Sequence, residues 1–218
     1  MPQFTKTQQN KVRRLPKRGS YDKQTIYNII DEGLICHVGF VVGDQPFVIP
    51  TLHGRIDDQL FLHGSNSSRL MRWIAEGNPI SAAITILDGL VLAKSVFHHS
   101  VNYRSVVLFG KGQLLEEDAD KLIGLEAITN HVSPGRWQEA RLPTQHELDI
   151  TAVAAIPIDS ASAKIRSGPP LDDIADMSLP VWSGVLPLRL EPLPAEPTPD
   201  VQESYPIPEV IRAYRRSF

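Results

Sequence analysis

The chain lacks several features that would assign it to a compartment or to a common class of ligand. Its 218 residues include a single cysteine, Cys36, so no disulfide can form within the chain. No apolar run approaches the roughly 20 residues needed to span a bilayer, and no signal-like apolar segment stands at the N-terminus. The net charge of −3 argues against binding of polyanions. These absences predict a cytoplasmic protein in a reducing compartment, with neither nucleic acid nor membrane as a partner.

The motifs of several common enzyme sites are also missing. There is no glycine-rich dinucleotide or P-loop fingerprint, no GxSxG nucleophile elbow, and neither HExxH nor CxxC. His98 and His99 are adjacent, and neighbours in a strand face opposite sides, so this pair cannot easily share one metal ion. No metal site is therefore expected, unless three histidines converge in space.

Charge and proline divide the chain into three predicted segments. Residues 1–20 form a basic N-terminal arm, residues 21–186 a folded domain, and residues 187–218 a proline-rich C-terminal arm. Up to residue 23 a single acid, Asp22, stands against the bases Lys6, Lys11, Arg13, Arg14, Lys17, Arg18 and Lys23. Such an arm is either a solvated tail or a segment that wraps over a neighbouring subunit or an anionic ligand.

The middle of the chain is rich in strands and poor in helices. Apolar runs predict about seven strands, at residues 34–42, 47–56, 60–63, 80–87, 90–100, 103–115 and 149–158, with 162–166 as one more candidate. Helices are predicted over residues 22–33, 68–76 and 116–132. Because the strands are not each followed by a helix, a doubly wound parallel sheet is not expected. The pattern predicts a mainly β fold with flanking helices (α+β), closed into a small barrel.

The hexapeptide GSNSSR, residues 64–69, joins a predicted strand to a predicted helix. The first turn of a helix has free N–H groups and a partial positive charge, and serine and asparagine add short hydrogen-bond donors. Arg69 adds a planar cation suited to phosphate. The same residues also form an ordinary helix cap beside a solvent-facing arginine. The stretch therefore predicts either a phosphate cradle or a simple cap.

The strand one hairpin earlier favours the cradle. In FVIPTLHG, residues 47–54, apolar residues flank Pro50, which has no backbone N–H. An interrupted strand leaves backbone groups free to meet a flat heteroaromatic ring. A strand edge that binds a ring, next to a phosphate cradle, suits a mononucleotide better than a bare phosphate ion.

Six segments, taken in order, resemble one bacterial family. They are KRGSYDKQTIYNIIDEGLICHVGFVVGDQPFVIPT, LFLHGSNSSRLMRWI, FHHSVNYRSVVLFGKG, PGRW, SAKIRSGPP and PVWSGVLPL. The family is the flavin-nucleotide-binding branch of the pyridoxamine 5′-phosphate oxidase-like proteins, related to the nitroimidazole-resistance proteins. The resemblance spans roughly residues 13 to 190. It implies a split β-barrel of the FMN-binding type, assembled as a homodimer with FMN at the subunit interface.

The resemblance also implies roles for residues of the first two segments. Ser68 and Arg69 match the segment that holds the ribityl phosphate, and His63 and Ser65 are the next candidates. The strand that would lie along the isoalloxazine ring, largely through its backbone, comprises Val48, Ile49, Pro50 and Thr51.

Later segments supply further candidates, each with a structural alternative. Tyr103 and Ser105 share one face of a strand and would reach a flavin from across the dimer, although Tyr103 also suits barrel packing. Trp137 and Trp182 would neighbour the ring or a substrate, or would anchor the core or an interface. Arg104 faces the other side of its strand and is expected to pair with the carboxylates of residues 116–120.

This sequence departs from true pyridoxamine-phosphate oxidases at three positions. Those enzymes carry additional arginine or lysine residues that serve phosphate groups, where this chain has Pro46, Thr51 and Leu70. Vitamin B6 oxidase activity is therefore not expected. The missing charge could come from the basic arm, through Arg14, Lys17 or Arg18.

Three hypotheses of function remain open at this level. The first is an FMN-dependent oxidoreductase with an unknown small acceptor and no assigned catalytic residue. The second is a flavin carrier or sensor without turnover. The third is a relative that binds deazaflavin or haem, with His63, His98 or His99 as an axial ligand.

Overall fold

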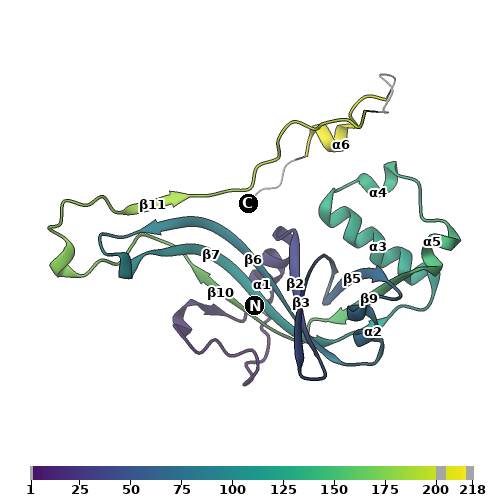
Figure 1. Cartoon of the computed structure of the whole chain (residues 1–218), viewed down its shortest axis with the longest axis horizontal. Coiled ribbons are helices and arrows are strands. Elements are labelled where there is room, and N and C mark those ends of the chain that lie inside the picture. Colours follow the sequence, from purple (N-terminus) through teal and green to yellow (C-terminus); the bar gives the residue numbers. More distant parts are fainter. Residues whose placement is uncertain (1, 200–204, 215–218) are drawn as a thin grey trace.

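Two antiparallel sheets form the framework of the protein (Figure 1). The computed structural model describes residues 2–199 and 205–214. The larger sheet has the strand order β1-β10-β7-β6-β2-β3, with β11 paired to β6, and the smaller sheet has the order β4-β5-β9-β8. The bounds are β1 Gly19–Ser20, β2 Ile35–Val42, β3 Gln45–Leu52, β4 Gly54–Ile56, β5 Gln59–Ser65, β6 Pro79–Leu92, β7 Ser100–Lys111, β8 Gln113–Leu114, β9 Thr151–Pro157, β10 Ser160–Arg166 and β11 Gly184–Pro187.

Helices flank the sheets and close the open ends. The α-helices are α1 Lys23–Glu32, α2 Arg69–Ala75, α3 Asp118–Val132, α4 Arg136–Glu139, α5 Gln145–Asp149 and α6 Glu209–Arg212, and the 3-10 turns are η1 Pro16–Arg18, η2 Val96–His98 and η3 Ile174–Asp176. Asp22 caps α1 by accepting a hydrogen bond from the Thr25 N–H at 2.9 Å, as its sequence predicts. Helix α3 covers β4, β5 and β9 of the smaller sheet.

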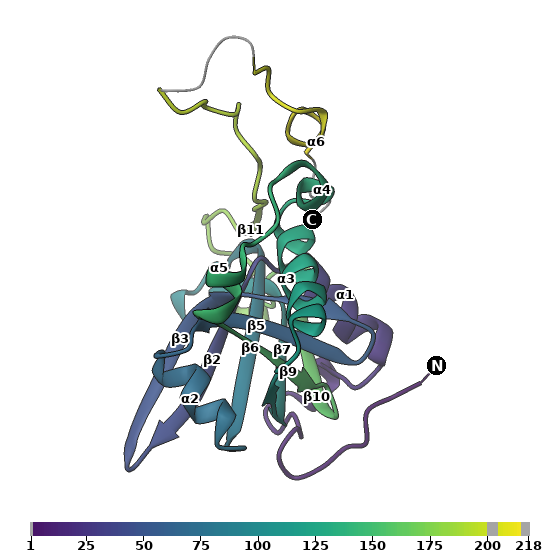
Figure 2. The ribbon, with the colours of Figure 1, turned by 90° about the vertical axis from the view of Figure 1, so that its right-hand side faces the viewer.

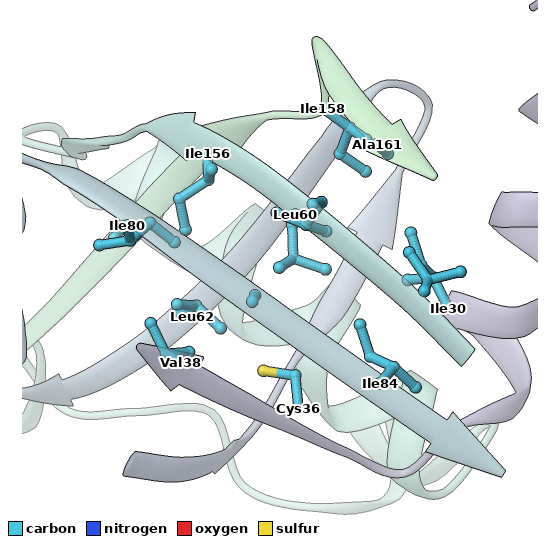
Figure 3. Packing of buried hydrophobic residues seen from close by; sticks show 14 of the residues in the cluster. Ile30, Cys36, Val38, Leu60, Leu62, Ile80, Ile84, Ile156, Ile158 and Ala161 are labelled. Carbon is cyan, nitrogen blue, oxygen red and sulfur yellow. The ribbon is translucent and has the colours of Figure 1, made fainter. Parts of the chain in front are cut away.

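One apolar core fills the space between the two sheets (Figure 3). Leu60 and Leu62 of β5 and Ile156 of β9 meet Ile84 of β6, and none of these side chains is exposed. Burying each one contributes about 1.5–3 kcal/mol relative to exposure. Phe61 and Ala155, which alternate with these residues on β5 and β9, point to the other face and are buried in a second, smaller cluster with Ile128 of α3. Both faces of these strands therefore fix the register. The predicted split β-barrel with flanking helices is confirmed.

Several strand predictions are wrong at their ends, and the predicted strand 103–115 also divides at Gly112 into β7 and β8 of different sheets. Residues 80–87 and 90–100 were each expected to form a strand, but β6 runs unbroken from Pro79 to Leu92, with a bulge between Leu87 and Gly89. The predicted strand 47–56 instead divides at His53 into β3 and β4, which belong to different sheets. His53 is wholly buried, and its Nε2 lies 3.0 Å from the Ile30 carbonyl, so the chain turns inward there.

The pairing predicted for Arg104 is also wrong. Its guanidinium binds Asp88, with Nη2 2.7 Å from Oδ1, and Glu32, with Nη2 2.7 Å from Oε1. The hydrogen bonds that Arg104 donates to Asp88 and Glu32 raise its pKa further above its ordinary value. The reason is topological: β7 lies beside β6, which carries Asp88, whereas residues 116–120 lead into α3 on the smaller sheet.

The two predicted arms differ in how closely they follow the domain. In the N-terminal arm Phe4 is buried in the core, and the Asn10 amide donates to the Ala161 carbonyl at 3.3 Å. After β11 the C-terminal arm runs extended (Figure 1), and Tyr214 Oη donates to the Val132 carbonyl at 2.9 Å. The boundaries at residues 20 and 186 stay predictions.

Gly54 provides a test of how α3 is seated on the smaller sheet. A Cβ at this position would lie 2.5 Å from the Ala127 carbonyl carbon and 2.6 Å from the Ile128 nitrogen, both backbone atoms of α3. Gly54→Ala should therefore lower the free energy of unfolding by about 1–3 kcal/mol, the usual cost of overpacking, as measured by urea denaturation. Gly64→Ala is the matched control, because its Cβ would make only ordinary contacts of 3.4 Å or more. Equal stability of the two variants would contradict this packing.

Candidate functional site

Strand β3 is an edge of the larger sheet (Figure 2). On one side it pairs with β2, and no described strand of that sheet pairs with its other side. Phe47 and Ile49 pack against the core, whereas Val48 is 67% exposed. Because Pro50 lacks an N–H, this edge offers carbonyl groups and a few N–H donors along an apolar surface. It is the strand predicted to lie along a flavin ring.

The turn before α2 is held in a defined shape by hydrogen bonds within the turn and to α5. The Asn66 amide donates to the Asp149 carbonyl at 2.6 Å, which ties the turn to α5. Ser65 Oγ and Ser67 Oγ lie 2.9 Å apart, and Ser68 Oγ accepts from the Met71 N–H at 3.1 Å. Helix α2 thus begins at Arg69 with Ser68 as its N-cap, one residue later than predicted. Its first turn presents N–H groups beside exposed hydroxyls.

Arg69 joins this turn to the edge strand. Its guanidinium carbon lies 4.1 Å from the centroid of the Phe47 ring, a cation–π contact that holds the side chain against β3. Arg69 is exposed, and no carboxylate of the described residues pairs with it. The structure therefore brings together the predicted phosphate residues and the predicted ring-binding strand, with an arginine between them that carries an uncompensated charge.

His63 of β5 and Ser68, the N-cap of α2, lie on opposite sides of the β5 strand. A Cβ on Gly64 would meet Ser68 Oγ at 3.5 Å, so the Gly64 face looks toward α2. The neighbouring His63 lines a cavity of about 260 Å³ with Leu125 of α3 and Glu147 of α5. Burial lowers the pKa of His63, and its Nδ1 is buried without a hydrogen-bond partner among the described residues. A neutral imidazole thus faces a small cavity that is separate from the Arg69 cradle.

The outer face of the larger sheet carries the other sequence candidates. Tyr103 and Ser105 lie on β7 opposite Leu87 and Thr85 of β6. Three strand spacings separate β7 from β3, about 14 Å at roughly 4.8 Å each. Within one chain these two residues therefore cannot touch a ring that lies on β3. Their contact from a second subunit stays a prediction.

The two tryptophans lie far apart in the chain's fold. Trp137 is half-buried in α4, beside α3. Trp182 is 67% exposed just before β11, on the long ribbon of β6, β7 and β11 (Figure 1). The structure does not bring either one to the Arg69 cradle.

The basic arm lies at the opposite edge of the larger sheet from β3. The turn η1, which contains Lys17 and Arg18, packs against β10, and Arg18 contributes to lowering the pKa of the buried Arg166. Burial of Arg166 is the larger cause of that shift. The arm therefore does not add charge to the Arg69 cradle of its own chain.

One residue that the sequence reasoning passed over lines a larger cavity. His37 projects from β2 between the buried Cys36 and Val38, so it faces away from the core. It borders a cavity of about 720 Å³ between β2, β6 and the segment that follows β11, whose lining is Gly33, Leu34, Ile35, His37, Thr85, Ile86, Leu87, Asp88, Leu188, Arg189 and Leu190. The signal in the sequence that could have identified His37 was a histidine at an outward-facing position of an otherwise apolar strand.

Among residues 2–199 and 205–214, no cluster of three or more histidine, cysteine or acidic side chains is placed to hold a metal ion. None of the helices in these ranges is long and apolar enough to cross a membrane.

Comparison with known proteins connects this geometry to a family. Residues 22–165 match the family described as pyridoxamine 5′-phosphate oxidase. The flavocytochrome Anf3 from Azotobacter vinelandii is 36% identical with a TM-score of 0.90, and the match covers 97% of this chain and 98% of that one. The FAD and haem binding protein from Mycobacterium smegmatis is 35% identical with a TM-score of 0.86, covering 90% and 96%.

A more distant match shares the fold alone. A candidate 5-nitroimidazole antibiotic resistance protein from Bacteroides thetaiotaomicron is 22% identical, with a TM-score of 0.58 over 67% of this chain and 86% of that one. Comparison with curated proteins gave no significant match. The family match covers well over half of the 218 residues, and two solved relatives align with nearly the whole fold. This chain therefore belongs to the pyridoxamine 5′-phosphate oxidase-like family.

Proposed function

We propose that the protein is a redox flavoprotein that holds its flavin between the edge strand β3 and the first turn of α2. The observation that carries the proposal is the position of Arg69, an exposed cation without a carboxylate partner among the described residues, stacked on Phe47 of the edge strand. A riboflavin phosphate needs both an anion cradle and a flat apolar edge, and these two features adjoin here. Two relatives that align over nearly the whole chain, named as a flavocytochrome and an FAD and haem binding protein, support the same class of cofactor.

Each part of the cradle has a distinct role in this proposal. Arg69 and the hydroxyl groups of Ser65 and Ser68 hold the phosphate, and the backbone N–H groups of the α2 first turn complete its shell. The β3 backbone around Pro50 lies along the ring and supplies polar groups near its carbonyl edge. A bound flavin supplies the electron transfer, while the protein supplies binding and orientation. No catalytic side chain is assigned.

FMN is the flavin predicted from the sequence, and FAD is its rival. Both contain riboflavin phosphate, so the Arg69 cradle fits either one. The FAD in the name of the Mycobacterium smegmatis relative favours the dinucleotide. A carrier that does not turn over is the alternative to an oxidoreductase. Pyridoxamine-phosphate oxidase activity is not proposed, because Leu70 is buried and Thr51 Oγ donates to the Leu52 carbonyl at 3.2 Å, so neither supplies a phosphate-binding charge.

A haem is proposed as a second cofactor. The specific observation in its favour is that two relatives above 30% identity carry a cytochrome or haem in their names. The chain also offers a cavity of about 720 Å³ with a mostly apolar lining that includes one imidazole and the charged Asp88 and Arg189, within the range of cofactor sites. Flavin and haem together would make the protein a flavocytochrome that passes electrons between the two groups. A cytoplasmic location stays a prediction from the single cysteine.

A homodimer is proposed from the exposed apolar surface. The outer face of the larger sheet carries Ile35, Val48, Leu87 and Val107, each at least 36% exposed. The ribbon of β6, β7 and β11 adds further exposed side chains: Val96, Phe97, Leu171, Ile174, Met177 and Trp182. Exposed apolar surface of this extent marks an interaction site, and a second copy fits the predicted contact of Tyr103 and Ser105 with a partner's flavin.

The absorption spectrum of the purified full-length protein tests the flavin proposal. Flavin bands should be present, or should appear with a shifted maximum on addition of FMN or FAD. Chromatography of the heat-released cofactor then separates FMN from FAD. Anaerobic titration with NADH and NADPH should bleach the bands of an oxidoreductase, and bands that resist both donors would favour a carrier. A protein that binds neither flavin would overturn the proposal.

Arg69→Ala tests the phosphate cradle directly. Loss of a hydrogen bond to a charged group should weaken flavin binding by about 1.5–3 kcal/mol, measured by fluorescence titration. Arg72→Ala is the matched control, because Arg72 is an exposed arginine in the last turn of the same helix. Unfolding of both variants should be compared, since Arg69 also contacts Phe47. Equal flavin affinity in the two variants would reduce the turn to a helix cap.

Val107→Glu tests the dimer. Val107 lies near the centre of the outer sheet face and is 36% exposed, so a glutamate costs little in a monomer but places a charge in an interface. Sedimentation should show a dimer for the natural chain and a monomer for the variant at micromolar concentration. Ile123→Glu, at a 50% exposed position of α3, should remain dimeric. A natural chain that is monomeric with flavin bound would contradict the assembly.

A further inference from the structure

We propose that His37 is the axial iron ligand of a haem bound in the cavity between β2, β6 and residues 188–190. This inference rests on the proposed haem-binding function and goes beyond it by assigning the site and the ligand. Neither the family's sequence pattern nor the names of the relatives places a ligand at this position. The direction of the His37 side chain, the lining of the cavity and the surroundings of the other histidines support this assignment.

The alternation of β2 directs His37 into this cavity. Cys36 and Val38 are wholly buried and point into the core (Figure 3), so the residue between them must face outward. The imidazole lines the cavity, and it makes no hydrogen bond with any of the described residues. A ring held on a strand and free of hydrogen-bond partners is suited to bind a metal through a nitrogen lone pair.

The cavity matches the chemistry of a haem in its lining and its size. Haem is a flat apolar macrocycle with two carboxylates at one edge and an iron that accepts a histidine ligand. About 720 Å³ is available, and the walls are mostly aliphatic, including Ile35, Leu87, Leu188 and Leu190. Arg189 is the one basic side chain in the lining, and a guanidinium is suited to pair with a propionate.

The wall of the cavity is anchored rather than loose. The Leu188 N–H donates to the Asp88 carbonyl at 3.0 Å, which continues the pairing of β11 with β6. The Asp88 carboxylate is bound to Arg104, so it does not present a free negative charge to the propionates. The segment 188–190 therefore forms a fixed side of the cavity, on which Arg189 stands at the rim with only a weak 3.4 Å contact to Glu191.

The histidines proposed from the sequence are less suited to this role. His63 faces a cavity of about 260 Å³, too small for a porphyrin. His98 Nε2 lies 3.1 Å from the Asp173 carboxylate, and His99 Nδ1 lies 3.0 Å from the Ser95 carbonyl. Both of these stand at the tip of the β6–β7 ribbon, away from the core of the sheet.

The remaining histidines are also less suited than His37 to bind the iron of a haem in this cavity. His53 Nε2 lies within hydrogen-bond distance of the Ile30 carbonyl, and His131 Nε2 within hydrogen-bond distance of the Gly33 carbonyl. His146 is exposed on α5.

The position of His37 also connects the haem to the proposed flavin site. His37 is the cross-strand partner of Pro50, at the middle of the strand assigned to the flavin ring. Adjacent strands lie roughly 4.8 Å apart, so a haem on His37 and a flavin on β3 would be close neighbours. This arrangement gives electrons a short route between the two groups within one chain.

Haem titration of the full-length protein with its flavin retained tests the assignment. Haemin added to the natural chain should give a Soret band shifted to that of a histidine-ligated haem. His37→Ala should lower haem affinity at least about tenfold and shift the band, whereas His99→Ala should behave as the natural chain. Imidazole added to His37→Gly should restore the ligated spectrum. Retained flavin absorbance and an unchanged thermal unfolding midpoint show that the variants are folded.

The outcomes separate this inference from the proposed function. If the natural chain binds haem and the His37→Ala variant binds it with the same affinity and spectrum, the assignment of the ligand is overturned, whereas the proposed haem binding stands. A natural chain with no Soret shift would overturn both the assignment and the proposed haem, while its flavin bands would still decide the flavin proposal. Loss of haem in His99→Ala but not in His37→Ala would assign the ligand to the ribbon tip and refute the proposal.

Discussion

The fold depends on one constraint: two sheets must bury their apolar faces against each other around a single core. Leu60, Leu62, Ile84 and Ile156 meet in that core, and their strands cannot shift by one residue without exposing them. Every outward side chain is then fixed as well. The placement of His37 on one face of β2 and of His63 on the outer face of β5 follows from the same burial.

The candidate site exists because the larger sheet stops at β3. An edge strand keeps unpaired backbone groups, which soluble proteins usually cover or interrupt. Here Pro50 interrupts the edge, and Arg69 from the neighbouring helix rests on Phe47. An edge prepared in this way is suited to a flat ligand with a phosphate, and the apolar outer face beside it is suited to a second subunit.

Much of the fold was predictable from local patterns. Alternating apolar residues identify most strands, Asp22 marks the start of α1, and the GSNSSR turn leads into α2. The errors arose where distant contacts override local signals. Asp88 and Gly89 read as a turn, but β11 pairs across them and keeps β6 continuous. Arg104 found its carboxylates on α1 and β6 rather than on the helix that is nearer in sequence.

The sequence by itself determined the family, the split-barrel class and the closeness of the strand 47–56 to the GSNSSR turn, because all three are encoded in short contiguous segments. Only the tertiary structure decided which face each side chain occupies. It separated His63 from Arg69, placed the basic arm at the edge opposite β3, and set His37 against a cavity whose far wall comes from residues 188–190. Such a cavity joins segments about 150 residues apart, and no local pattern records that meeting.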